Sequence, residues 1–321
     1  MRYVEAHGAR LSAIGLGTWQ FGSREWGYGS DYANTEAVAI VHRAIELGIN
    51  LIDTAEIYGF GRSERIVGGA IAGRRDDVFV ATKVFPLMPL APIVEQRGRA
   101  SARRLKIEPI DLYQVHWPNP VVPIGTTMEG IRRLQHAGVV THAGVSNFDL
   151  AKWQTAESAL GSTVLTNQVQ FSLVQRKPER DLVPWAQQTG HVAIAYSPLA
   201  QGFLGAKYDA SSRPGGVRAG NSLFLPENLD RAQPLFAALR ETAAAHGATP
   251  AQVALAWLIR KPNVVAIPGA SSVSQLESNA AAADIELSDE QNDRLTAASD
   301  AFHPTAGAAA LPQLLRARLS R

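Results

Sequence analysis

Asp53 and Tyr58, which lie in the stretch NLIDTAEIYGFG, have the clearest potential for chemistry in this chain. A short apolar run precedes Asp53 and suits a buried strand, and a buried carboxylate is rarely left without a partner. Tyr58 is followed by Gly59 and Gly61, which permit a tight loop where the backbone can approach a ligand. A reaction centre fits this stretch, and so does a solvent-facing turn in which Asp53 caps a helix. The rest of the chain must decide between the two.

Two more titratable residues end apolar segments further along, namely Lys83 in DVFVATK and His116 in DLYQVH. A tyrosine with a pKa of about 10 is a poor acid near neutrality, and a nearby ammonium such as Lys83 lowers that pKa. Asp53 can hold Lys83 in a buried ion pair. His116 can donate a hydrogen bond to a substrate carbonyl or pass a proton to Tyr58. We therefore expect an acid that protonates a carbonyl oxygen as negative charge develops there.

Each of these residues also has an ordinary interpretation, since Lys83 could be solvated and His116 could be a core histidine. Other catalytic chemistries have less support. The chain has no cysteine, which excludes disulfides and thiolate nucleophiles. Ser146 is followed by Asn147 and does not lie in a Gly-x-Ser-x-Gly elbow. The histidines lack ligand spacing, so we expect no metal. Side chains cannot supply hydride, so a reduction needs an organic cofactor.

Strand-like and helix-like segments alternate along the chain and would position these residues. A hairpin is expected from residues 2–6 and 10–12. Eight strands are then expected at residues 13–17, 49–53, 77–83, 111–116, 139–147, 164–170, 192–197 and 264–267. Helices are expected at residues 34–47 (with Asn34 as N-cap), 62–72, about 93–105, 126–137, 149–160, 179–188, 229–246 and 272–281, with others starting after Thr249 and Ser288. A long irregular loop is expected at residues 198–228.

Eight strands that alternate with helices predict an α/β fold with a closed, parallel (β/α)8 TIM barrel, an N-terminal β-hairpin and extra C-terminal helices. An open, doubly wound sheet is the alternative, and it usually carries a Gly-x-Gly-x-x-Gly turn. Here Gly15-Leu16-Gly17 is followed by Thr18-Trp19-Gln20, so that fingerprint is incomplete. In a barrel the strand ends converge on one face. The expected ends are Trp19, Asp53, Lys83, His116, Ser146 with Asn147, Gln168, Tyr196 and Gly269.

Composition limits the class of protein. The 321 residues are 46% hydrophobic and 19% charged, as expected for a soluble globular enzyme, and we expect one barrel domain over residues 1–321. A formal net charge of +2 does not suggest a nucleic-acid partner. The start of the chain lacks the apolar core of a signal peptide, and no apolar run is long enough to span a bilayer. A cytoplasmic protein without a membrane partner is expected, and its oligomeric state stays open.

The sequence resembles the aldo-keto reductase superfamily over nearly its whole length, from residue 14 to residue 279. The stretches that carry the resemblance are IDTAEIYGFGRSE, VATKV, IDLYQVHWPNP, HAGVSNF, NQVQFS, AYSPLAQGFLGAKY and IPGASSVSQLESN. The family's catalytic tetrad falls on Asp53, Tyr58, Lys83 and His116. The resemblance implies that Tyr58 donates the proton, and that a nicotinamide cofactor lies across the barrel mouth.

The resemblance also implies the binding residues. Ser146, Asn147 and Gln168 would bind the carboxamide of the nicotinamide, and Tyr196 would stack on its ring. The full expected cofactor set is Gly17, Thr18, Trp19, Asp53, Ser146, Asn147, Gln168, Tyr196, Ser197, Leu199, Gln201, Gly202, Lys207, Arg218, Gly269, Ser271, Gln275 and Asn279. Trp19, Tyr58, His116 and Trp117 would contact a carbonyl substrate, with Trp26, Tyr28 and residues 85–91 also near the pocket. These aromatic side chains suggest an apolar or aromatic carbonyl compound.

One departure from the family pattern concerns the cofactor's 2′-phosphate. Many members have Lys and Arg where this chain has Gly269 and Gln275. The pattern GASSVSQLESN is more similar to the branch that includes potassium-channel β-subunits, which bind NADP. We therefore expect NADPH/NADP, with Lys207, Arg218 and Ser271 replacing the missing charge. A nicotinamide-binding regulatory or sensing subunit with little turnover is the second interpretation. A phosphate-binding isomerase or lyase barrel without nicotinamide, with Lys83 as a Schiff-base candidate, is the third.

Overall fold

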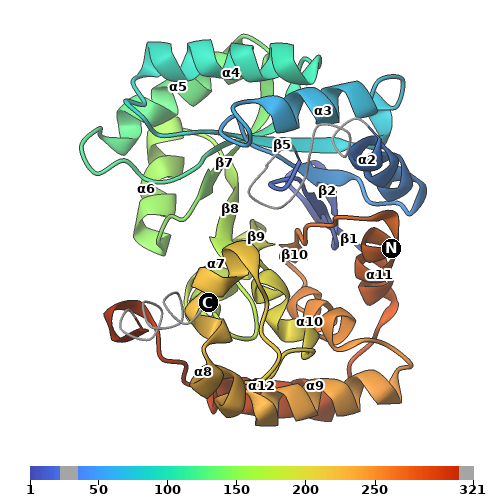
Figure 1. Cartoon of the computed structure of the whole chain (residues 1–321). Helices are drawn as coiled ribbons and strands as arrows, with labels where there is room; N and C mark the ends of the chain where they lie inside the picture. The colour runs from blue at the N-terminus through green and yellow to red at the C-terminus, as the bar shows by residue number, and fades with distance from the viewer. Residues whose placement is uncertain (22–34, 311–321) are drawn as a thin grey trace.

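The computed structural model describes residues 1–21 and 35–310 (Figure 1). Trp26 and Tyr28, which were expected near the substrate, lie outside the described residues, as do Asn34 and the tail from residue 311. Within the part of the chain that is described, no helix combines the length and the apolar character needed to cross a membrane.

Eight parallel strands form the centre of the molecule, with helices around them (Figure 1). Each strand pairs with the next one along the chain, in the order β3 to β10. Their bounds are β3 Leu16–Gly17, β4 Leu51–Asp53, β5 Phe79–Val84, β6 Ile110–Val115, β7 Val140–Ser146, β8 Val164–Gln170, β9 Val192–Tyr196 and β10 Val264–Ala266.

Backbone hydrogen bonds join the first and last strands of this sheet. Gly15 N donates to Ala266 O at 2.8 Å, and Gly17 N donates to Pro268 O at 3.1 Å. The sheet has no free edge at this seam, so the strands form a barrel. The predicted (β/α)8 fold is confirmed, and the open-sheet alternative is wrong for this chain.

The helices lie between the strands in chain order. Their bounds are α2 Glu36–Glu46, α3 Arg62–Ala70, α4 Ala91–Leu105, α5 Ile124–His136, α6 Leu150–Leu160, α7 Leu182–Thr189, α8 Pro226–Arg231, α9 Gln233–Ala245, α10 Pro250–Ile259, α11 Val273–Ala281 and α12 Asp289–Asp300. The expected capping box before α10 is present, because Thr249 and Gln252 each bind the other's backbone N–H. Ser288 and Gln291 do the same before α12.

The expected helix at residues 229–246 is wrong, because the structure has two helices there. α8 ends at Arg231 and α9 begins at Gln233, with Pro234 in the first turn of α9. A proline lacks the N–H that would continue the helix, and it suits the first turn of a new one. The loop at residues 198–228 is not wholly irregular either, since it contains 3-10 turns at Ala200–Gly205, Gly216–Gly220 and Ser222–Phe224.

The N-terminal hairpin pairs β1 (Tyr3–Ala6) with β2 (Ala9–Ser12) and packs against the barrel interior. Ala6, Ala9 and Leu11 belong to one buried cluster with barrel residues such as Leu51 and Phe79. Leu51 is the first residue of β4 and Phe79 is the first residue of β5, so the hairpin covers the end of the barrel where the strands begin. The opposite end, where the strands terminate, is left for a ligand.

Gly68 and Gly69 offer a matched test of packing between α3 and α4. A Cβ atom at Gly68 would lie 2.3 Å from the backbone oxygen of Leu105, whereas one at Gly69 meets no described atom within 4 Å. We expect Gly68→Ala to lower the free energy of unfolding by about 1–3 kcal/mol, because the backbone cannot move aside cheaply. Gly69→Ala should leave it unchanged or raise it by up to about 1 kcal/mol. Urea denaturation measures both, and equal stability of the two variants would contradict this packing.

Candidate active site

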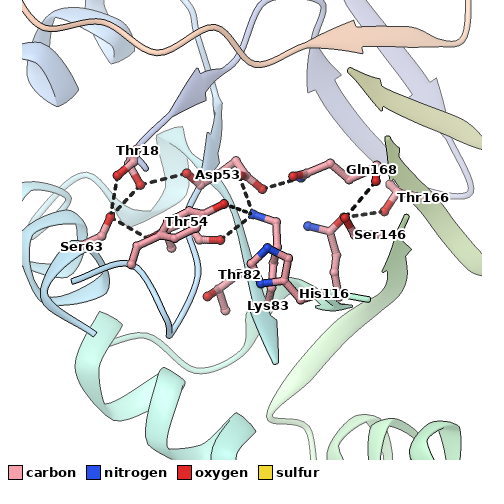
Figure 2. Close-up of polar contacts among 12 residues, drawn as sticks. Thr18, Asp53, Thr54, Ser63, Thr82, Lys83, His116, Ser146, Thr166 and Gln168 are labelled. Atoms are coloured by element: carbon pink, nitrogen blue, oxygen red, sulfur yellow. Dashed lines mark hydrogen bonds and ion pairs between the residues drawn. The ribbon is translucent and has the colours of Figure 1, made fainter. Parts of the chain in front are cut away.

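Lys83 is the centre of a buried polar network at the ends of β4 and β5 (Figure 2). Its Nζ atom donates to Asp53 Oδ1 at 2.6 Å, to the Thr54 carbonyl at 2.9 Å and to Tyr58 Oη at 3.3 Å. The sequence folds this way because β4 ends at Asp53 and pairs in parallel register with β5, which carries Lys83. The structure thus joins Asp53, Lys83 and Tyr58, and a solvent-facing turn around Asp53 is wrong.

Asp53 also connects this network to the far side of the barrel. Its Oδ2 atom accepts a hydrogen bond from Gln168 Nε2 on β8 at 2.7 Å. Ser146 Oγ at the end of β7 donates to the Gln168 carbonyl at 2.8 Å (Figure 2). The Gln168 amide nitrogen, expected to bind a carboxamide, is therefore engaged by Asp53 here.

The expected lowering of the Tyr58 pKa is wrong in its net direction. Burial raises the pKa of the Tyr58 hydroxyl above its usual value, and the Asp53 carboxylate adds to the rise, although Lys83 acts in the opposite sense. Burial alone would lower the pKa of Lys83, but Asp53 and Tyr58 raise it above its usual value. At neutral pH Tyr58 is a protonated phenol next to an ammonium. It is an acid that holds its proton until a stronger base is formed nearby.

The charged state of Lys83 also bears on the Schiff-base interpretation. A lysine that forms a Schiff base needs a neutral amine, which usually requires a lowered pKa. The pKa of Lys83 is raised, and its side chain is fully buried behind three oxygen partners. The geometry therefore favours a charge-stabilising role for Lys83.

His116 lies directly after β6 and faces the tyrosine, with its ring centroid 5.9 Å from that of Tyr58 in an edge-on arrangement. It stacks on Trp117 at 3.9 Å. Burial, together with the charge of Lys83, lowers the pKa of His116 to about 2. A neutral imidazole can still donate one hydrogen bond, but it has no extra proton to pass to Tyr58. Of the two roles expected for His116, the structure favours the hydrogen-bond donor.

A cleft of about 1260 Å³ opens above this network. This volume exceeds the roughly 300–1,000 Å³ of a common small-molecule pocket, which suits a ligand as long as a dinucleotide. All eighteen residues of the expected cofactor set line it, as do the expected substrate residues Tyr58, His116 and Trp117. Lys83 does not line the cleft, because Tyr58 and Asp53 lie between it and the opening.

The ends of β7 and β9 are held together beside His116. Asn147 Nδ2 donates to the His116 carbonyl at 3.1 Å, and Tyr196 Oη donates to Asn147 Oδ1 at 3.0 Å. Asn147 has a positive φ of 61°, a conformation that asparagine tolerates better than most residues. These bonds fix the amide of Asn147 and the ring of Tyr196 at the cleft wall.

The cleft lining also includes cations, amides and hydroxyl groups. Lys207 and Arg218 line the cleft, on the segment that follows β9. Ser271 and Gln275 line it as well, and Ser272 accepts a hydrogen bond from Gln275 N at the start of α11. The Gln275 side chain binds Ser271 N at 2.9 Å instead of Ser272 N, so the Ser272–Gln275 pair is only half of a capping box. The two cations and the N-terminus of α11, a helix of nine residues, give the cleft a positive character that suits an anionic ligand.

Close backbone packing shapes the seam side of the cleft. A Cβ atom at Gly17 would lie 2.8 Å from the Ile267 carbonyl, so the side chain is excluded there. Gln20, which is not among the expected site residues, donates to the Ala270 carbonyl at 2.7 Å and also lines the cleft. Arg62 and Thr249 line it too. The sequence pattern around Thr249 indicates a helix cap, and it does not indicate a ligand-binding role.

The cleft lining includes exposed aromatic residues. Trp19 is 46% exposed, Trp117 is 41% exposed and Phe60 is 92% exposed, and all three line the cleft. Residues 85–91, expected near the pocket, are not part of the cleft lining. Phe85 instead packs edge-on against Trp117, with ring centroids 6.0 Å apart.

Fold and site together define a (β/α)8-barrel protein with a hydrogen-bonded network of Asp53, Lys83 and Tyr58 under a dinucleotide-sized cleft. Residues 13–300 match the model of the aldo/keto reductase family. This chain belongs to that family, as the resemblance implied.

Its relatives include oxidoreductases. The chain is 56% identical over 322 aligned residues to an uncharacterized oxidoreductase of Mycobacterium tuberculosis, with 100% of both chains covered. It is 37% identical to the methylglyoxal reductase YeaE of Escherichia coli, with 87% of each covered. A crystal structure of an aldo-keto reductase from Klebsiella pneumoniae in complex with NADPH matches with a TM-score of 0.75 and 36% identity, over 92% of this chain and 95% of that one.

Proposed function

We propose that this protein reduces aldehydes or ketones to alcohols with NADPH, and that Tyr58 is the proton donor. The observation that carries the proposal is the hydrogen-bonded set of Asp53, Lys83 and Tyr58 beside a neutral His116, at the floor of the cleft. The match to the aldo/keto reductase family and the NADPH-bound structural neighbour support the same reaction class.

In the proposed reaction the carbonyl carbon gains a hydride and the carbonyl oxygen gains a proton. The reduced nicotinamide, when bound, supplies the hydride. Tyr58 gives its proton to the oxygen as negative charge develops there. Lys83 stabilises the phenolate that remains, and Asp53 holds Lys83 in place. His116 donates a hydrogen bond to the same carbonyl oxygen, which polarises the bond and orients the substrate.

The residues at the wall of the cleft support a dinucleotide ligand. Ser146, Asn147 and Tyr196 line the cleft and would face the nicotinamide end. Lys207, Arg218 and Ser271 would hold the 2′-phosphate and the pyrophosphate, since cations and hydroxyl groups bind such anions. We infer from these cations that NADPH is preferred over NADH.

The proposal is tested by following NADPH absorbance at about 340 nm with a panel of aliphatic and aromatic aldehydes, and by repeating the assay with NADH. Turnover that depends on the carbonyl compound and is faster with NADPH supports the proposal. Tight NADPH binding without consumption across the whole panel would contradict it, and would favour a sensing subunit. Equal affinity for NADH at physiological salt would contradict the assigned role of the cations.

The low pKa of His116 predicts the shape of the pH profile. Because this imidazole is neutral well below pH 6, kcat should show no inflection near pH 6.5, where an ordinary histidine titrates. Tyr58 should stay protonated through this range, because its pKa is raised. The measurement is kcat at saturating NADPH from about pH 5 to 9. An inflection near pH 6.5 that is absent in His116→Gln would contradict the neutral state.

A further inference from the structure

A second group of charges lies behind the loop that carries Tyr58, outside the cleft lining. Glu56 precedes Tyr58 by two residues on this loop. One of its carboxylate oxygens, Oε1, accepts a hydrogen bond from Phe85 N at 2.5 Å and pairs with Arg97 Nη2 at 2.6 Å. The other, Oε2, accepts from Arg97 Nε at 3.0 Å. The Glu56 side chain is only 9% exposed, so these partners, and not water, satisfy most of its carboxylate.

These contacts join the Tyr58 loop to the strand that carries Lys83. Phe85 directly follows β5, and the Glu56 backbone N–H donates to the Lys83 carbonyl at 3.4 Å. Arg97, on α4, also donates to the Phe85 carbonyl at 2.8 Å. The ion pair therefore holds the loop on one side of the Tyr58–Lys83 hydrogen bond against the strand on the other side.

The same group also reaches His116. Both the backbone N–H and the backbone carbonyl of Phe85 are hydrogen-bonded in this group. The ring of Phe85 packs edge-on against the His116 ring, with centroids 6.5 Å apart. One ion pair thus connects the segments that carry the proposed acid, its ammonium partner and its histidine neighbour.

We propose that Glu56 and Arg97 are positioning residues for proton transfer, because they set the distance between Tyr58 and Lys83 without touching the substrate. The inference rests on the proposed function. Tyr58 Oη lies 3.3 Å from Lys83 Nζ, at the long end for a hydrogen bond, so little further displacement is tolerated. A misplacement of about 1 Å in a catalytic group can lower the rate by about 10²-fold.

A matched ion pair lies near the start of the barrel strands. Asp111, near the start of β6, accepts a hydrogen bond from Val80 N on β5 at 2.7 Å and pairs with Arg75 at 2.8 Å. Arg75 also donates to the backbone carbonyl of Pro109 at 2.9 Å. This pair has the same ingredients as Glu56 and Arg97, namely a strand N–H, an arginine and a backbone carbonyl, but it belongs to the end opposite the cleft.

The experiment compares Arg97→Met and Glu56→Gln with the control Arg75→Met. For each variant we would measure kcat and KM for a reactive aromatic aldehyde, the Kd for NADPH by fluorescence, and the thermal midpoint. We expect kcat to fall about 10- to 100-fold in the first two variants, while the Kd for NADPH changes less than about twofold. Arg75→Met should lower the thermal midpoint by about as much as Arg97→Met does, but it should leave kcat unchanged. Arg97→Lys should recover part of kcat, because it keeps the charge but cannot reach Glu56 and the Phe85 carbonyl together.

A stable Arg97→Met or Glu56→Gln protein with the native kcat would overturn the inference, as would an equal loss of kcat in Arg75→Met. If Arg97→Met does not fold, Glu56→Gln and Arg97→Lys carry the test, because both conserve size or charge. If the native protein turns over the aldehyde and these variants have the same kcat, only the positioning role is overturned. A native protein without turnover would overturn the proposed function, and the inference with it.

Discussion

Tyr58→Phe is expected to lower kcat for carbonyl reduction by about 10²–10⁴-fold, with NADPH still bound, because the substitution removes only the proposed acid. The Tyr58 side chain is half-buried at the cleft and bonded to Lys83, and a phenylalanine ring fills the same space. The substitution removes a single oxygen atom, so it changes little of the surface that would bind the cofactor. The measurement is NADPH consumption together with NADPH binding by fluorescence.

Tyr113→Phe is the matched control for this variant. Tyr113 lies on β6, is completely buried, and its hydroxyl has no hydrogen-bond partner among the described residues. The same atom is removed, so any general effect of losing a tyrosine hydroxyl inside the fold appears in both variants. Tyr113→Phe should keep the native kcat. Turnover of Tyr58→Phe within about twofold of native would exclude Tyr58 as the proton donor.

Lys83→Met is expected to lower the free energy of unfolding by about 3–5 kcal/mol, in addition to abolishing most of the activity. Removing one partner of a buried ion pair leaves the other charge without compensation. Asp53 is 2% exposed and, among the residues that the structure describes, would keep only the Gln168 amide as a side-chain hydrogen-bond partner. Equilibrium denaturation in urea measures the loss. Lys152→Met, which removes an exposed pair with Asp149, should cost no more than about 1 kcal/mol.

The double variant Asp53→Asn with Lys83→Met separates charge from packing. With no charge left to bury, it should recover a large part of the stability lost in Lys83→Met, because neutral replacements of buried pairs are often tolerated. Its activity should stay low, since the ammonium that stabilises the phenolate is still missing. A double variant less stable than Lys83→Met would show that the two charges are not energetically coupled.

Much of the barrel could be predicted from the sequence, because its signals are local. The apolar segments that end at Asp53 and at Lys83 are strands in the structure, and the caps at Thr249 and Ser288 form as their residue types require. The break between α8 and α9 has a local signal as well, because Pro234 cannot continue a helix, but the expected helix at residues 229–246 ran through it.

Residue type and spacing were enough to predict which residues could do the chemistry, since parallel strands place their last residues at one end of a barrel. How those residues behave depends on contacts between distant segments. Burial, which no local pattern reports, raises the pKa of Tyr58 and lowers that of His116 to about 2. The pairing of Asp53 with Gln168 joins segments 115 residues apart in sequence. The contact of Glu56 with Arg97 depends likewise on how α4 packs beside the Tyr58 loop. Such contacts arise from packing between distant segments, and residue type and spacing do not specify them.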